Sequence, residues 1–202
     1  MRLSIAFVLS LSVALGGCSS KDSGSSAQDA SADSGDVTPA ATAIVWSVSP
    51  GDNATSSCGA MNDTWSVGDT SMNPLEVVSS GSTSNGVQVL VACVVAPTAT
   101  GFSVMADVQY GSKGSLSISG PIAVVGSAQP GVQMGVTGLF GDHLGLNADL
   151  SESDCTVTFN QNPNMGVAAT RIWGVIDCPH ATASDGTVCD ATAQFLFENC
   201  GG

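Results

Sequence analysis

Apolar and polar side chains alternate with a period of two along most of this chain, and this alternation constrains the fold more than any other feature. Spacings of three and four residues, which an amphipathic helix needs, are scarce, so the chain is predicted to be all-β. The clearest example is residues 102–110, where the even positions are apolar or aromatic: Phe102, Val104, Ala106, Val108 and Tyr110.

The residues after this strand predict a hairpin. Pairing Tyr110 with Leu116 puts both apolar rows on one face if residues 112–114 form a three-residue loop. Gly114 would then adopt the left-handed conformation that such loops need. Further strands are predicted at 44–48, 132–137, 156–160, 169–177 and 192–198.

Two other segments have distinctive patterns. Residues 87–96, VQVLVACVVA, are almost continuously apolar, which predicts a central strand covered on both faces. Residues 139–150 predict a loop or a short helical turn, because glycines at 141 and 145 disfavour a longer helix. Many short strands with glycine-rich turns predict two packed antiparallel sheets, a β-sandwich or jelly roll, in one domain over residues 41–202.

Six of the seven cysteines lie in this domain. An even count in an exported domain predicts three disulfides, whereas zinc ligation is disfavoured because no CxxC pair occurs. An extended segment between Cys189 and Cys200 would hold these two residues too far apart to pair. The predicted pairs are Cys58–Cys93, Cys178–Cys189 and Cys155–Cys200, and the main alternative is Cys155–Cys178.

The N-terminal residues have the pattern of an export signal. Arg2 precedes an apolar run, residues 3–15, that is too short for a membrane-spanning helix of about 20 residues, so residues 1–17 are predicted to be cleaved. The junction Leu15-Gly16-Gly17-Cys18 resembles the lipobox of bacterial lipoproteins. This resemblance implies a diacylglycerol on the Cys18 sulfur and a further acyl chain, such as palmitate, on its amine. Several acyl chains hold a protein firmly on a bilayer.

The resemblance also implies a destination, because Ser19 rather than Asp follows the cysteine and outer-membrane localisation is then expected. The alternative is an ordinary secretory signal with Cys18 as a spare thiol. Residues 19–40 are rich in Ser, Ala, Asp and Gly, which predicts a disordered linker with a root-mean-square span of about 25 Å.

The domain is strongly acidic. Thirteen acidic residues face only Lys113 and Arg171, which gives residues 41–202 a formal charge of −11. A nucleic-acid surface needs clustered cations, so nucleic acid is excluded as a partner, and phosphate sites of the Walker type are disfavoured. The acidity is expected to serve solubility.

Few residues suggest catalysis. His143 and His180 are the only imidazoles, and neither belongs to a spaced ligand pair. No GxSxG, SxxK, HExxH or Walker sequence occurs, so the chain is predicted to have no cofactor and no local catalytic motif. A cluster of oxygen-bearing side chains could bind calcium, namely Asp142, Asn147, Asp149, Glu152 and Asp154. The cluster lacks the EF-hand pattern, which favours a solvated acidic loop instead.

The three tryptophans could contact a ligand or fill the core. Trp46 and Trp173 lie inside predicted strands and are expected in the core. Trp65, among the polar residues of NDTWSVGD, is the better candidate for a surface contact with a glycan.

Near its C-terminus the chain reads CTVTF from Cys155, RIWGVIDCP from Arg171 and TVCDATAQFLFENC up to Cys200. This pattern resembles the end of uncharacterised bacterial lipoproteins with a cysteine-stapled β-domain, a resemblance that implies no activity. The sequence therefore predicts a lipid-anchored envelope protein that binds a glycan or protein partner or has a structural role. The alternatives are a carbohydrate-binding module and an exported hydrolase whose residues meet only in three dimensions.

Overall fold

The structure, a computed structural model, describes residues 38–50, 63–70, 75–123, 128–139, 147–159, 163–183 and 186–201, all within one compact unit, Val37–Gly202. The all-β prediction is confirmed, because every regular element among these residues is a strand. The strands are β1 (Ala41–Ser49), β2 (Asp63–Val67), β3 (Val78–Ser79), β4 (Thr83–Ser84), β5 (Val87–Pro97), β6 (Gly101–Tyr110), β7 (Gly114–Ala123), β8 (Gln129–Leu139), β9 (Asn147–Thr158), β10 (Gly166–Ala168), β11 (Arg171–Ala183) and β12 (Val188–Glu198).

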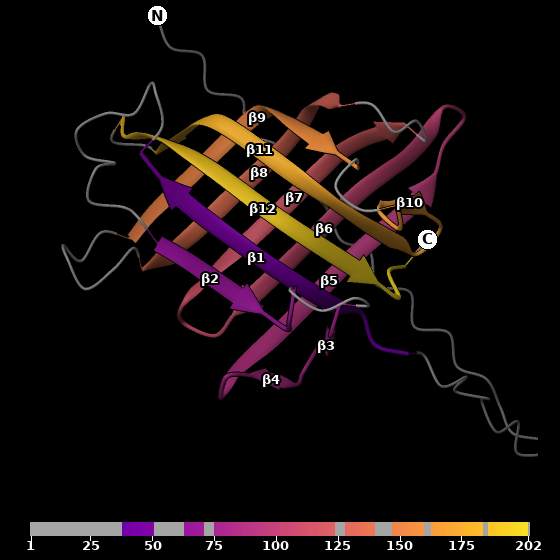
Figure 1. Cartoon of the computed structure of the whole chain (residues 1–202), viewed down its shortest axis with the longest axis horizontal. Helices are drawn as coiled ribbons and strands as arrows, with labels where there is room; N and C mark the ends of the chain where they lie inside the picture. The colour runs from indigo at the N-terminus through magenta and orange to yellow at the C-terminus, as the bar shows by residue number, and fades with distance from the viewer. Residues whose placement is uncertain are drawn as a thin grey trace, which may run out of the picture. The chain divides into compact units, whose positions relative to one another are not determined.

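The strands form one antiparallel sheet in the order β2-β1-β12-β11-β9-β8-β7-β6-β5-β4, with the short strands β3 and β10 paired to β1 and β11. In Figure 1, β1, β2, β11 and β12 lie in front, and β5 to β8 cross behind them. The antiparallel, sandwich-like arrangement is thus confirmed, but its two layers are halves of one continuous sheet rather than separate sheets. Strands β5 to β9 follow one another along both the chain and the sheet, whereas β1 lies beside the last strand, β12.

The end of the chain joins the two halves of the sheet. After β12, Gly201 forms a parallel bridge with Val94 of β5. The amide of Val95 donates to the carbonyl of Gly201 over 2.8 Å, and the amide of Gly201 donates to the carbonyl of Cys93 over 2.9 Å. The Cys93–Cys200 disulfide covalently closes the same junction.

The core lies inside this curved sheet, and each long strand contributes one row of side chains to it. Alternation with a period of two places these side chains on a single face. The largest fully buried side chains are Trp46, Phe195, Phe197, Ile44, Leu116, Ile118, Ile122, Ile172 and Ile176, together with Val48 and Val67.

Strand β5 differs from its prediction. Val89, Val91 and Val95 are buried as expected, but the alternate positions Leu90 and Val94 are 45% and 38% exposed. The expectation of cover on both faces is wrong, because the sheet encloses one core and, among the described residues, no second layer packs on the outer face of β5.

The predicted hairpin is present as β6 and β7 with a different register. Tyr110 pairs with Gly114, and Leu116 pairs with Val108 instead of Tyr110. Both apolar rows still face the core. The loop comprises residues 111–113, and the left-handed residue next to Tyr110 is Gly111, with φ of 52°, instead of Gly114.

The other predicted strands, 44–48, 132–137, 156–160, 169–177 and 192–198, overlap β1, β8, β9, β11 and β12. The expected loop or helical turn at 139–150 is only partly covered by the structure. Residues 147–150 belong to β9 instead, where they pair with β8, and residues 140–146 lie outside the described residues.

Disulfide formation is confirmed, but the predicted pairing is wrong. Cys93 bonds to Cys200, and Cys155 bonds to Cys178, the pair considered as the main alternative. Cys189 is also disulfide-bonded, to none of these four. Cys58 lies outside the described residues, as do Cys18, the predicted signal peptide and nearly all of the linker.

Candidate functional site

A shallow groove crosses the outer face of four neighbouring strands, β7, β8, β9 and β11. It has a volume of about 520 Å³. This "outer groove" is lined by Ser117, Ser119, Gln133, Met134, Gly135, Ser151, Glu152, His180 and Thr182. Most of these residues carry hydroxyl, amide or ionisable groups, so the groove presents polar groups alongside apolar atoms.

Strand pairing aligns a row of hydroxyl groups across the outer groove. Ser117 pairs with Gly135, Gly135 pairs with Ser151, and Ser151 pairs with Thr182. Adjacent strands lie about 4.8 Å apart, so the row spans about 14 Å. Gly135 contributes no side chain to the row, and the Ser117 hydroxyl oxygen takes up the space beside it, since a Cβ atom there would lie 2.6 Å from that oxygen.

One end of the outer groove is shaped by irregular strand pairing. The register between β8 and β9 shifts between Val132 and Met134, and that between β11 and β12 shifts between Cys178 and Ala181. Such bulges redirect side chains and occur often beside functional sites. Here they lie next to Glu152 on β9 and His180 on β11.

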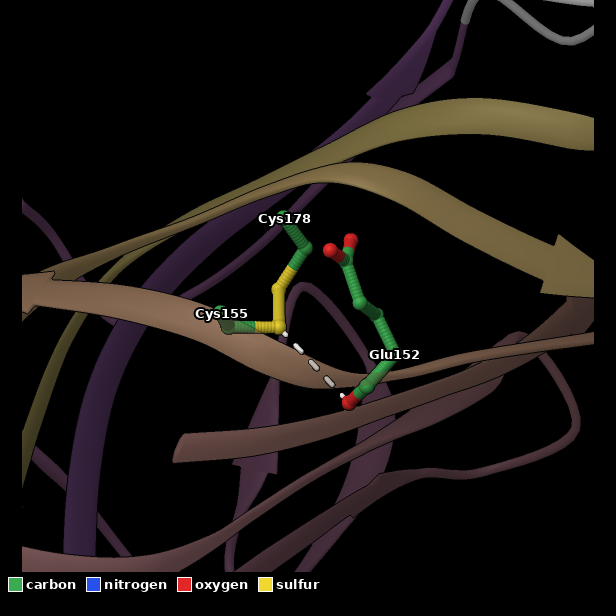
Figure 2. A group of neighbouring side chains, drawn as sticks. All are labelled: Glu152, Cys155 and Cys178. Atoms are coloured by element: carbon green, nitrogen blue, oxygen red, sulfur yellow. Dashed lines mark hydrogen bonds between the residues drawn. A yellow bond between two sulfur atoms is a disulfide. The ribbon is translucent and has the colours of Figure 1, made fainter. Parts of the chain in front are cut away.

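The Cys155–Cys178 disulfide lies beside the bulges and joins the same two strands. Figure 2 shows Glu152 next to this disulfide, with its carboxylate directed toward β11. The Cys155 sulfur lies 3.7 Å from the Glu152 carbonyl oxygen, and the Cys178 sulfur lies 3.2 Å from the Met134 sulfur. The disulfide therefore fixes the backbone on which Glu152 and His180 stand.

Glu152 and His180 form the ionisable pair of the groove. The His180 amide donates a hydrogen bond of 2.8 Å to Glu152 Oε2, and His180 Nδ1 lies 3.9 Å from Oε1. The Glu152 side chain is 11% exposed, whereas that of His180 is 57% exposed. The carboxylate is thus held in a defined position, and the imidazole faces solvent.

A metal centre does not fit this cluster in the oxidised protein. Ligand atoms of Glu152, Cys155 and Cys178 lie within 4.8 Å of one another. Thiolates are the form in which cysteine binds metal, and both sulfurs are instead used in the disulfide. The two cysteines form a covalent cross-link, the pair that the sequence analysis gives as the main alternative.

The acidic group considered for calcium lies mostly on a strand. Asp142 is outside the described residues, whereas Asn147, Asp149, Glu152 and Asp154 all belong to β9. The expected solvated loop is therefore wrong for these four residues. A strand spreads its residues along about 3.3 Å each, whereas a calcium loop folds its ligands around one point.

The prediction that Trp65 contacts a ligand at the surface is wrong. Trp65 is 7% exposed and stacks on Trp46, with ring centroids 5.7 Å apart. Its strand, β2, alternates like the others, so Trp65 and Val67 face the core while Thr64 and Ser66 do not. The polar neighbours of Trp65 obscured this short alternation.

The other two tryptophans are buried as predicted, but in different clusters. Trp46 belongs to the main core, whereas Trp173 packs with Ala43, Leu75 and Leu196 in a smaller one. The Arg171 guanidinium lies 5.5 Å from the centroid of the Trp173 ring, within cation–π distance.

Of the two histidines, the structure describes His180, and His143 lies outside the described residues. Sequence reasoning considered Glu152 and His180 separately and did not pair them. A signal was present, because Glu152 lies three residues before Cys155 and His180 two residues after Cys178. Choosing the Cys155–Cys178 disulfide would have brought both side chains to one place.

None of the described residues forms a helix long and apolar enough to span a bilayer. Comparison of the chain with protein-family models, curated proteins and solved structures finds no match. The function must therefore be inferred from the chain itself.

Proposed function

We propose that the protein is a lipid-anchored component of the bacterial outer membrane, whose β-domain binds a ligand through the outer groove. The binding role depends on one observation above all. Glu152, 11% exposed and fixed by the His180 amide, is presented in a groove lined by hydroxyl groups. Ligand sites are concave surfaces in which a few polar groups converge.

The anchoring part of the proposal is supported by the lipobox-like sequence Leu15-Gly16-Gly17-Cys18 and the polar linker that follows it. The disulfides are compatible with a location outside the cytoplasm, because disulfides persist in oxidising compartments. With a span of about 25 Å, the linker would let the domain stand away from the bilayer.

Anchoring can be tested with Cys18→Ala in the native host. We expect wild-type protein in the outer-membrane fraction, with an N-terminal peptide carrying diacylglycerol and an acyl chain by mass spectrometry. Cys18→Ala should lose both modifications. As a matched variant, Ser19→Asp should keep the lipid but move to the inner membrane, as the resemblance to lipoproteins implies. An unmodified wild-type N-terminus would contradict the anchor.

The hydrolase alternative is less well supported by the groove. A nucleophile–base–acid arrangement needs the acid to hydrogen-bond the histidine ring. The 3.9 Å between His180 Nδ1 and Glu152 Oε1 exceeds hydrogen-bond length, and Glu152 instead accepts the backbone amide of His180. This geometry favours binding over catalysis.

A further inference from the structure

We infer that the ligand of the outer groove is a neutral oligosaccharide lying across β7, β8, β9 and β11. This inference rests on the proposed binding function and adds the chemical class of the ligand. Three properties of the groove lead to it, namely its charge, its place in the sheet and the arrangement of its hydroxyl groups.

The charge of the groove excludes anionic ligands. Among the described residues that line it, the only strictly ionic group is the Glu152 carboxylate, and none is a lysine or arginine. The two strong bases of the domain, Lys113 and Arg171, lie in the β6–β7 turn and at the start of β11. A carboxylate, sulfate or phosphate group would therefore meet Glu152 in an acidic domain without a compensating cation.

The place of the groove in the sheet argues against an extended peptide. A peptide commonly binds a sheet by adding a strand to an unpaired edge. Each strand under the groove has a neighbour on both sides, since β7, β8, β9 and β11 are interior strands of the order. Outside the bulges beside Glu152 and His180, their backbone groups are engaged in the ladder, so the groove offers mainly side chains and no free strand edge.

The hydroxyl groups match a ligand that carries many hydroxyl groups itself. Ser117, Ser151 and Thr182 stand in one row, about 14 Å long. The contacts that some groups make with each other are weak, because Ser117 Oγ lies 3.4 Å from the Gly135 carbonyl and Ser119 Oγ lies 3.5 Å from Gln133 Oε1. Ser117 and Ser119 can exchange such contacts for shorter ones to a ligand at little cost, whereas Thr182 already donates a hydrogen bond of 2.8 Å to the His180 carbonyl and can still accept one.

Glu152 and His180 complete the set of groups suited to a sugar. The carboxylate can accept from ligand hydroxyl groups through Oε1 while Oε2 keeps the His180 amide. The described lining includes no Trp, Tyr or Phe, so binding depends on hydrogen bonds, and Gly135 leaves the Ser117 hydroxyl in place because it has no Cβ atom to displace it. An oligosaccharide that contacts several strands at once can form more of these hydrogen bonds than a single sugar ring can.

The test uses the full-length lipidated protein in a detergent without sugar groups, applied to an array of neutral oligosaccharides, anionic oligosaccharides and polar peptides. We expect binding to neutral oligosaccharides only. Gly135→Val, whose Cβ would displace the Ser117 hydroxyl group, and Ser151→Ala, which removes the central hydroxyl group, should each weaken binding at least tenfold. Glu152→Gln should weaken it as well.

The matched control is Ser103→Val, at an exposed outward position of β6 away from the groove, which should bind like wild type. Thermal unfolding of each variant ensures that binding is compared between folded proteins. Absence of binding to neutral oligosaccharides, equal binding by Gly135→Val, or a preference for anionic sugars or peptides would overturn the inference. Membrane fractionation of the same protein distinguishes this failure from failure of the anchor.

Discussion

Asp107 stands on the outer face of β6, between Ala92 of β5 and Ser117 of β7. The exposed apolar side chains Leu90 and Val94 lie on the same face of β5, diagonal to it. Partial burial among these neighbours removes water from the carboxylate and raises its pKa above the usual 3.8. A carboxyl group with a raised pKa makes folding less favourable once it is charged.

This sign gives a prediction for Asp107→Asn. Above the folded-state pKa, the carboxylate is charged in both states, and the folded state alone has the desolvation cost. Asp107 therefore does not lower the free energy of unfolding below pH 3.8, and this free energy decreases as the pH rises through the folded-state pKa of Asp107. We expect Asp107→Asn to raise the urea midpoint slightly at pH 7, since the group is largely exposed, and to leave it unchanged near pH 3. A lower midpoint at pH 7 would contradict the desolvation argument.

Residue positions were predictable from the sequence where only local alternation decides them. The inward-facing row of the β6–β7 hairpin is the predicted one. Moving the loop by one position shifts the strand pairing by two residues, and a shift by two keeps the same side chains on the core face. The register itself was missed, since Gly111 and Gly114 both suit a loop. Gly111 takes the left-handed conformation, where a Cβ atom would lie 2.6 Å from a Val87 side-chain carbon, a contact that no local pattern reveals.

At the scale of elements, the disulfides join strands that are distant in sequence. Cys155–Cys178 links β9 to β11, which pair directly, and Cys93–Cys200 joins β5 to the chain end. Neither pairing follows from spacing, because both depend on strand order. The same limit hid the outer groove, whose nine lining residues come from four strands, and the exposed face of β5.

The Cys93–Cys200 and Cys155–Cys178 disulfides should differ in their contribution to stability. They close separations of 107 and 23 residues, which the chain-entropy relation converts to about 5 and about 3 kcal/mol. We expect Cys93→Ala/Cys200→Ala to lower the free energy of unfolding more than Cys155→Ala/Cys178→Ala in urea titrations. The reverse order would show that strain or packing outweighs chain entropy.

Hydrogen exchange gives a local check on the same pair of variants. The amides of Val95 and Gly201 form hydrogen bonds across the junction that Cys93–Cys200 closes. Both amides should lose protection when this disulfide is removed and keep it when Cys155–Cys178 is removed. Equal loss in both variants would mean that the junction opens only with global unfolding.

At the scale of the whole molecule, electrostatic repulsion is expected to outweigh attraction in the acidic domain. Residues 41–202 carry a formal charge of −11, whereas the ion pairs seen among the described residues are Arg171–Glu198 and His180–Glu152. Arg171–Glu198 is about one-third exposed on both sides, so it contributes little. Repulsion among carboxylates should therefore outweigh attraction, and it favours the expanded, unfolded chain.

Salt then has a definite expected effect, because mobile ions screen this repulsion more than they weaken so few ion pairs. Raising sodium chloride from about 10 mM to about 300 mM shortens the screening length from about 30 Å to less than 10 Å. At pH 7, the urea midpoint of unfolding should rise. Near pH 4, close to the sequence pI of about 4.1, the same change in salt should have almost no effect. A urea midpoint that falls with salt at pH 7 would mean that attractive ion pairs dominate. An equal rise of the midpoint at both pH values would mean that salt acts through its general exclusion from the protein surface instead of through charge screening.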